Sequence, residues 1–246
     1  MKTSNKILLG ALIVVVLLMT VSAAFLKTNV FGDVIKGDGD VRQENRPVEA
    51  FDRIDIGGNF QVYFTQEGPT KLMVSADNNL MEYILSEVVD GELRVYSTNR
   101  LQSRNIQLDI SSSDIRQIKA TAGARIFGRN AITTPQLTLL GSAGAQLELE
   151  AMVEQLIVNL SAGSRATLSG TADEAEYEAS AGSRVSAYDL EAKSVRAKGS
   201  AGSTLEVNAS ESLSAEGSAG SGIYYAGTPM INELNLSAGA AIHQRK

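Results

Sequence analysis

One tetrapeptide returns seven times in the second half of the chain and limits what the chain can fold into. It reads Thr-Ala-Gly-Ala, Ser-Ala-Gly-Ala or Ser-Ala-Gly-Ser, and its glycines are Gly123, Gly144, Gly163, Gly182, Gly202, Gly220 and Gly239. Successive glycines are 18 to 21 residues apart. A period of this length is typical of a solenoid, in which each repeat is stable only when it stacks on its neighbours.

Apolar and polar side chains alternate within the repeat. Counted from the glycine, positions −7, −5, −3, +3 and +5 are apolar or small, as in Leu156, Val158, Leu160, Ala166 and Leu168. This period of two is that of a β-strand with one buried face. Each unit therefore predicts about two strands, and stacking the units about 4.8 Å apart pairs their backbones. The predicted fold is all-β, a single-stranded parallel β-helix with about 19–20 residues per coil.

Two corners are expected in each coil. Glycine in a strand costs about 0.5–1 kcal/mol relative to alanine, so the regular glycines indicate a bend or a close approach. Pro135 and Pro229 lie 9 and 10 residues before the next repeat glycine, which predicts a second corner. Polar stretches such as 169–174 and 208–212 are predicted to be return segments between strands. No Phe follows Phe127, so the coil should be slender.

The pattern divides the chain into four parts. Residues 121–246 are the predicted repeat solenoid, and residues 46–120, with larger apolar residues in alternation, are a β region that caps it. Within that region Asp90-Gly91 predicts a tight hairpin, because both residues tolerate positive φ. Residues 27–45 are predicted to be a linker, and residues 1–26 a signal peptide or a signal anchor.

The first residues predict export. Residues 7–26 carry no charge, follow Lys2 and Lys6, and as a helix would be roughly 30 Å long, enough to cross a bilayer. Val21-Ser22-Ala23 also fits the small-x-small pattern of signal cleavage, so cleavage and retention as an anchor both stay open. Either way the body of the protein lies outside the cytoplasm, in the periplasm, membrane-anchored or at the cell surface.

Charge and composition exclude several classes of function. The net charge is −6, and cleavage after Ala23 would make it −8 by removing Lys2 and Lys6. Without a cluster of Lys and Arg, such a chain is not expected to bind nucleic acid. The absence of cysteine excludes a disulfide, a thiolate metal site and a cysteine nucleophile.

Few residues suggest catalysis. The only histidine, His243, is the fourth residue from the C-terminus and is expected in a frayed end. Paired acids could cleave glycosides, and the acidic residues cluster as Glu148, Glu150 and Glu154, then as Asp173, Glu174, Glu176 and Glu178 one coil later. A solvated acidic strand would give the same pattern. We therefore expect no enzyme, no catalytic residue, and no metal or cofactor.

A column of hydroxyl residues is the candidate interaction site. These residues occupy position −2 of the repeat and are Thr121, Ser142, Ser161, Ser180, Ser200, Ser218 and Ser237. Stacked beside the glycines they would make a strip on which a second copy or an envelope partner could approach closely. The alternative is that Ser-Ala-Gly recurs only because it forms the corner easily, with no role in binding.

Five segments resemble a known family. They are GDGDV from Gly37, RPVEAFDRIDI from Arg46, FQVYFTQ from Phe60, VSADNNL from Val74 and VDGELRV from Val89. With the later repeats, the chain from about residue 37 to its end resembles the "putative auto-transporter adhesin, head GIN domain" family of bacterial envelope proteins. The resemblance implies a signal or anchor followed by a β-helical domain, and it brings no catalytic residues with it.

These features favour a non-catalytic binding module of the cell envelope or surface, with an adhesive role in line with the resemblance. The expected partners are an envelope or surface component, a second copy of the chain, and the membrane if residues 1–26 are retained. The alternatives are a self-assembling stalk or scaffold and a carbohydrate-active enzyme.

Overall fold

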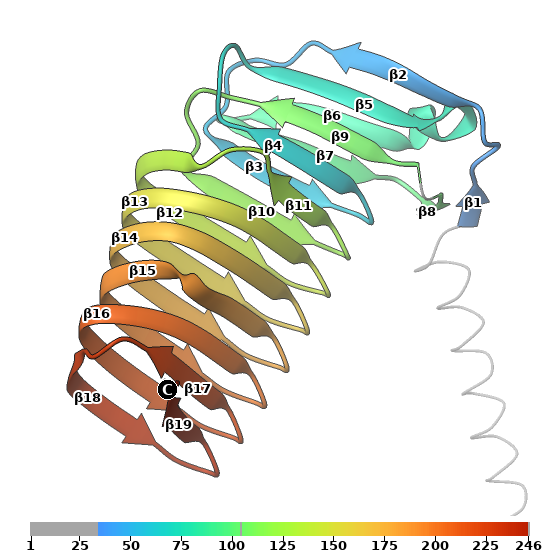
Figure 1. Cartoon of the computed structure of the whole chain (residues 1–246). Helices are drawn as coiled ribbons and strands as arrows, with labels where there is room; N and C mark the ends of the chain where they lie inside the picture. Colours follow the sequence, from blue (N-terminus) through green and yellow to red (C-terminus); the bar gives the residue numbers. More distant parts are fainter. Residues whose placement is uncertain (1–33, 104, 246) are drawn as a thin grey trace, which may run out of the picture.

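The computed structural model describes residues 34–103 and 105–245, which form a flattened coil of strands with a cap at its N-terminal end (Figure 1). The predicted signal peptide or anchor at residues 1–26 lies outside the described residues. Among the residues that are described, none belongs to a helix long and apolar enough to span a bilayer.

Long strands make up the regular part of the solenoid. They are β12 (Ile132–Gly141), β13 (Gln146–Leu160), β14 (Arg165–Ala179), β15 (Arg184–Gly199) and β16 (Thr204–Gly217). Consecutive strands pair in parallel and in sequence order. In each coil the strand half that leads into a Ser-Ala-Gly turn and the half that leaves it lie in two facing layers, here called the pre-turn face and the post-turn face (Figure 1). The predicted parallel β-helix is thereby confirmed.

The second edge of each coil is a bend within one continuous strand. Pairing skips one residue per coil at this bend, at Pro135, Glu154 and Asp173, which confirms the corner predicted from the phase of Pro135. The separate return segments are wrong, because residues 169–174 lie inside β14 and 208–212 inside β16. Backbone pairing thus continues around the bend.

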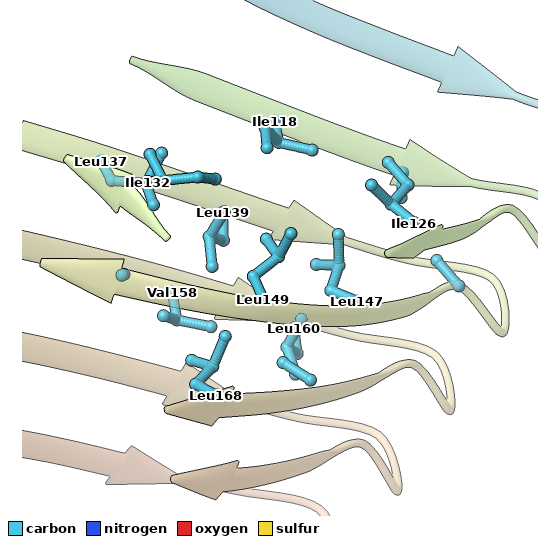
Figure 2. Close-up of a cluster of buried hydrophobic side chains, with 14 of the residues drawn as sticks. Ile118, Ile126, Ile132, Leu137, Leu139, Leu147, Leu149, Val158, Leu160 and Leu168 are labelled. Carbon is cyan, nitrogen blue, oxygen red and sulfur yellow. The ribbon is translucent and has the colours of Figure 1, made fainter. Parts of the chain in front are cut away.

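Apolar side chains from both faces fill the interior (Figure 2). Equivalent positions of successive coils pair in register, so that Ile118, Leu139, Val158, Tyr177 and Ala197 follow one another with no exposed surface. Tyr177 is the one large aromatic side chain in this column. It fits because its neighbours on the same strand, Ala175 and Ala179, are small, as is Ala197 in the next coil.

The N-terminal region continues both faces of the solenoid. Its elements are β1 (Val34–Lys36), β2 (Val41–Arg46), β3 (Arg53–Gly57), β4 (Gln61–Thr65), β5 (Lys71–Asp77), the 3-10 helix η1 (Asn78–Tyr83), β6 (Ile84–Val89), β7 (Glu92–Ser97), β8 (Arg100–Gln102), β9 (Gln107–Ser111), β10 (Gln117–Thr121) and β11 (Arg125–Gly128). β3 pairs in parallel with β7 and β10, and β4 with β9 and β11. After β4 the chain therefore forms an outer coil with β7 and β9 on one side of β3 and β4. At β10 it continues on their other side, where the regular solenoid begins.

Antiparallel strands end the parallel stack on this side. β6 pairs with β7, β5 with β9, and β2 with β5, all in antiparallel order. Asp90 and Gly91 both have positive φ in the β6–β7 turn, which confirms the predicted hairpin. Strand β1 and all of β2 except its last residue, Arg46, fall within residues 27–45, so the linker prediction does not hold from Val34 onward.

The last described strands belong to the C-terminal end of the solenoid. They are β17 (Gly222–Ala226), β18 (Met230–Leu236) and β19 (Ala241–Gln244). β17 and β18 continue the two faces from β16, and β19 pairs with β17. Neither β18 nor β19 has a strand on its outer side in the described part of the chain.

Candidate interaction surface

Each Ser-Ala-Gly turn contains two consecutive residues with left-handed backbone. In the fourth repeat φ is 48° at Ala181 and 70° at Gly182. The Ser183 amide donates a hydrogen bond of 3.1 Å to the carbonyl of Ser180 and closes a four-residue turn. Two positive φ angles in such a turn are those of type I′. Glycine adopts this conformation freely, whereas a left-handed alanine costs about 1–2 kcal/mol.

Hydrogen bonds between coils accompany this conformation. The amide of Gly163 donates to the carbonyl of Ala181, and that of Gly182 to Ala201, both at 3.0 Å, and the same bond recurs from Gly123 to Gly220. The parallel backbone ladder therefore runs through the turns, and the Ala-Gly pairs line up along one edge of the molecule (Figure 1). These bonds offset the conformational cost of the left-handed alanine.

The predicted column at position −2 is set back from the rim of this edge. Thr121 and the serines from Ser142 to Ser218 are half-buried, and only Ser237 is fully exposed. Their amides are used in pairing, as in the 3.0 Å bond from Ser180 to the carbonyl of Leu160. Alanines such as Ala162 are exposed at the rim. A partner that contacts this edge would therefore meet Ala and Gly first, with hydroxyl groups beside them.

A second hydroxyl column, at position +1, was missed from the sequence. Its members are buried and are Ser164, Ser183, Ser203 and Ser221. The Ser183 hydroxyl lies 2.7 Å from the carbonyl of Ser180 and 3.1 Å from that of Leu160 in the preceding coil, and it accepts a hydrogen bond from the Ser180 amide. This hydroxyl links two coils. The available signal was that position +1 changes from alanine to serine only in the central repeats.

Three members of the predicted column line a shallow groove with a volume of about 280 Å³, namely Ser200, Ser218 and Ser237. Its other polar walls come from the pre-turn face and are Glu178, Lys198, Glu216 and Asn235. The strand register places these four side chains in one column. Lys198 Nζ lies 3.8 Å from Glu216 Oε1. The groove thus offers hydroxyl groups together with charges of both signs to a polar ligand.

The acidic clusters do not form a common site. Glu148 and Glu150 lie on the post-turn face, whereas Glu176 and Glu178 lie on the pre-turn face. The residues in register with Glu176 on the adjacent strands are Ile157 and Arg196, so no carboxylate stands directly opposite it. Across residues 34–103 and 105–245, no group of three or more His, Asp and Glu side chains is placed to hold a metal ion.

His243 is not in a frayed end, as the sequence suggested, but in strand β19. Its ring stacks on Tyr224 with 5.4 Å between the centroids, and the strand pairs with β17. The neighbouring Arg245 guanidinium lies 4.4 Å from the centre of the Tyr188 ring. These contacts give the last described residues a defined place on the post-turn face.

A larger hollow of about 850 Å³ lies near the N-terminal cap. Its walls include Val34 of β1, Arg100 and Leu101 of β8, and Phe60 and Ile106 near the start of β4 and β9. None of the residues predicted for the interaction column lines it. This hollow was not predicted from the sequence, because its walls come from distant segments that the β1–β8 and β4–β9 pairings bring together.

The architecture defines a parallel β-solenoid with an antiparallel N-terminal cap and one edge of stacked tight turns. Residues 50–229 match the family described as "Putative auto-transporter adhesin, head GIN domain", and the chain belongs to this family. The resemblance noted in the sequence is therefore confirmed. No curated protein matches the chain.

Solved structures share the fold. A putative adhesin from Bacteroides fragilis has a TM-score of 0.82 and 22% identity, with 86% of this chain and all of that chain covered. A putative lipid binding protein from Parabacteroides distasonis has a TM-score of 0.71 and 19% identity, and a putative adhesin from Parabacteroides merdae 0.67 and 16%. For both, 87% of this chain and all of the other are covered. At these identities the likeness concerns the fold.

Proposed function

We propose that this chain is a non-catalytic, adhesive binding module presented outside the cytoplasm, and that the edge of stacked turns is its binding surface. The observation that carries the proposal is the groove beside this edge, where Ser200, Ser218 and Ser237 of the predicted column meet a ladder of charged side chains. Membership of a family described as adhesins supports the same reading.

The edge suits binding because its geometry is fixed before a partner arrives. Every turn is closed by its own hydrogen bond and joined to its neighbours by glycine amides. The side chains at the rim are alanine and glycine, which lose little or no rotamer freedom on contact. Binding of a partner would therefore cost this surface little conformational entropy, which favours affinity.

The arrangement of the acidic residues favours binding over hydrolysis. Glycoside hydrolysis requires two carboxyl groups facing one scissile bond, about 5–9.5 Å apart. Here Glu148 and Glu150 lie on the opposite face of the coil from Glu176 and Glu178, and Glu176 lies beside Arg196. A panel of polysaccharides assayed for release of reducing ends should give no products. Turnover that disappears on changing Glu176 or Glu178 would reverse this assignment.

Extracytoplasmic presentation rests on the uncharged segment at residues 7–26 and on the lysines before it. Cell fractionation, followed by N-terminal sequencing of the mature protein, tests it. A chain in the periplasm, on the membrane or at the surface supports the proposal, and a new N-terminus after Ala23 would show cleavage. A chain that keeps Met1 and is recovered with cytosolic proteins would contradict it.

The binding surface is tested by adhesion of beads that carry the protein to envelope polysaccharides and surface proteins. We expect retention on at least one of them, and loss of it when Ser200→Arg and Ser218→Arg are combined, because two long cations would fill the groove. Thr167→Arg with Thr171→Arg is the matched control, since both threonines are exposed outside the groove. Equal retention of both variants would place binding elsewhere, and no retention at all would reject adhesion.

A further inference from the structure

Among the described residues, none covers the interior at the C-terminal end of the solenoid. Ile231, Leu234 and Leu236 of β18 are in register with Leu213, Ala215 and Gly217 of β16, which line the lumen. The three β18 side chains are 43%, 47% and 37% exposed, whereas Leu213 and Ala215 are 0% exposed. Apolar positions that every other coil covers with the next one therefore face solvent here.

The strand edges at this end are also free. β18 pairs only with β16, and β19 only with β17, among the described residues. An exposed strand edge is a template for pairing with another chain unless charges, proline or a bulge protect it. β18 carries one charged residue, Glu233, in seven, and all seven are exposed; its pairing with β16 has a bulge at Asn232, which leaves residues 233–236 in regular register. This end thus combines apolar surface with unsatisfied backbone groups.

The N-terminal end differs because its interior is closed. There the antiparallel strands β2, β5 and β6 close the stack, and the core residues Leu80, Ile84 and Leu93 are buried. The outer strand β2 carries Arg42 and Glu44, which protect its edge. β6 also has a free outer edge among the described residues, but the core at this end is covered, so stacking of a C-terminal end on an N-terminal end would set the open interior against a closed surface.

We propose that a second copy of this chain covers the open end, with the two C-terminal coils stacked end to end around a twofold axis. Such an interface is isologous and closes after two subunits. β18 and β19 run in opposite directions along the two faces, so each twofold arrangement pairs strands in antiparallel order. The product is a finite dimer with the N-terminal caps at its two far ends, and not a growing stalk.

Charge selects between the two arrangements. If β18 pairs with the partner's β18, Glu233, the middle residue of the strand, comes opposite its own copy. Like charges directly opposite each other destabilise a strand pair. If β18 pairs with the partner's β19, Glu233 comes level with Gln244 at the end of that strand, next to Arg245, because the turn from Ser237 to Ala240 is centred between Ala238 and Gly239. Opposite charges favour this second arrangement.

The test is the mass of the full chain in detergent, measured by sedimentation over a range of concentrations. We expect a dimer for the native chain and a monomer for Leu234→Asp, which puts a charge on the open end. Leu85→Asp is the matched control, since Leu85 is similarly exposed on β6, and it should remain dimeric. Circular dichroism establishes that both variants are folded. A native monomer, progressive polymerisation, or a dimer that survives Leu234→Asp would each overturn the proposal.

Charge exchange tests the strand pairing. Glu233→Lys should weaken the dimer about tenfold, as should Arg245→Glu, and the double variant should restore it, since two symmetric ion pairs are inverted in sign. If the double variant stays as weak as the single ones, or if Glu233→Lys leaves the dimer unchanged, β18 does not pair with the partner's β19. Because these residues lie outside the adhesive groove, failure here would leave the binding assay unaffected.

Discussion

Tyr177 provides a test of how the lumen is packed. Its side chain is fully buried between the two faces, and its hydroxyl has no hydrogen-bond partner. A buried polar group without a partner costs about 1–3 kcal/mol. Tyr177→Phe removes that group and keeps the ring, at the expense of a void the size of one hydroxyl. We expect a net gain of about 1 kcal/mol in the free energy of unfolding, or about 2–4 °C in the melting temperature.

The same substitution should change the response to alkaline pH. Burial raises the pKa of Tyr177 well above its ordinary value of 10.0. Below pH 10 the phenol is protonated in both states, whereas above it only the unfolded chain releases the proton. The native protein should therefore lose about 1.4 kcal/mol of stability per pH unit above pH 10 that the phenylalanine variant retains.

Chemical denaturation at neutral and alkaline pH measures both effects. Tyr96→Phe is the control, because that tyrosine is exposed and its substitution should change stability by less than about 0.5 kcal/mol. A Tyr177→Phe variant that is less stable than the native protein at neutral pH would refute the reasoning, since it would mean that the hydroxyl is satisfied. An unchanged stability gap above pH 10 would show that the phenol ionises in the folded state.

Two pairs of substitutions test the corners. Gly170→Ala should destabilise the protein by more than about 3 kcal/mol, because φ is 111° and the new Cβ would lie 2.1 Å from the carbonyl oxygen of Ala151. Gly182 has a φ of 70° and open space around it, so Gly182→Ala should cost only about 1 kcal/mol. Urea titration measures both changes in the free energy of unfolding. Ser183→Ala should cost about 1 kcal/mol in the free energy of unfolding, because it removes the buried hydroxyl that links two coils. Ser180→Ala should cost less, because the hydrogen bonds of Ser180 are made by its backbone. Equal effects of the two variants would contradict the assignment of the buried column.

The repeat made the coil predictable because its signal is repeated seven times. The alternation around Leu156 and Val158 places strands, and the glycine spacing places one corner, in agreement with the structure. The bend at Asp173 was predicted as a loop because its residues are polar. In the structure polar side chains point outward there while the backbone stays paired, so polarity did not report on backbone pairing.

The N-terminal half was less predictable because its order in space differs from its order in sequence. β3 lies between β7 and β10, and no local pattern encodes that insertion. The predicted hydroxyl column lies one position away from the rim of the turn edge. Ser180 and Ser183 are both serines near the same glycine, and only the twist of the left-handed turn makes one half-exposed and the other buried.

The two proposals bear on each other through geometry. When β18 pairs with the partner's β19, the twofold axis runs along the strands, so the turns of both subunits lie on the same edge of the dimer. The alternative pairing of β18 with its own copy would put them on opposite edges. The charges of Glu233 and Arg245 thus favour the arrangement in which both grooves border the same edge, one on each face of the dimer, because the pre-turn face of one subunit continues as the post-turn face of the other. A ligand with repeated units could then engage both grooves at once, and such bivalent contact raises avidity by about 10²–10⁴ over a single site. Leu234→Asp should therefore weaken adhesion to a polymer while leaving the affinity for its single repeating unit unchanged.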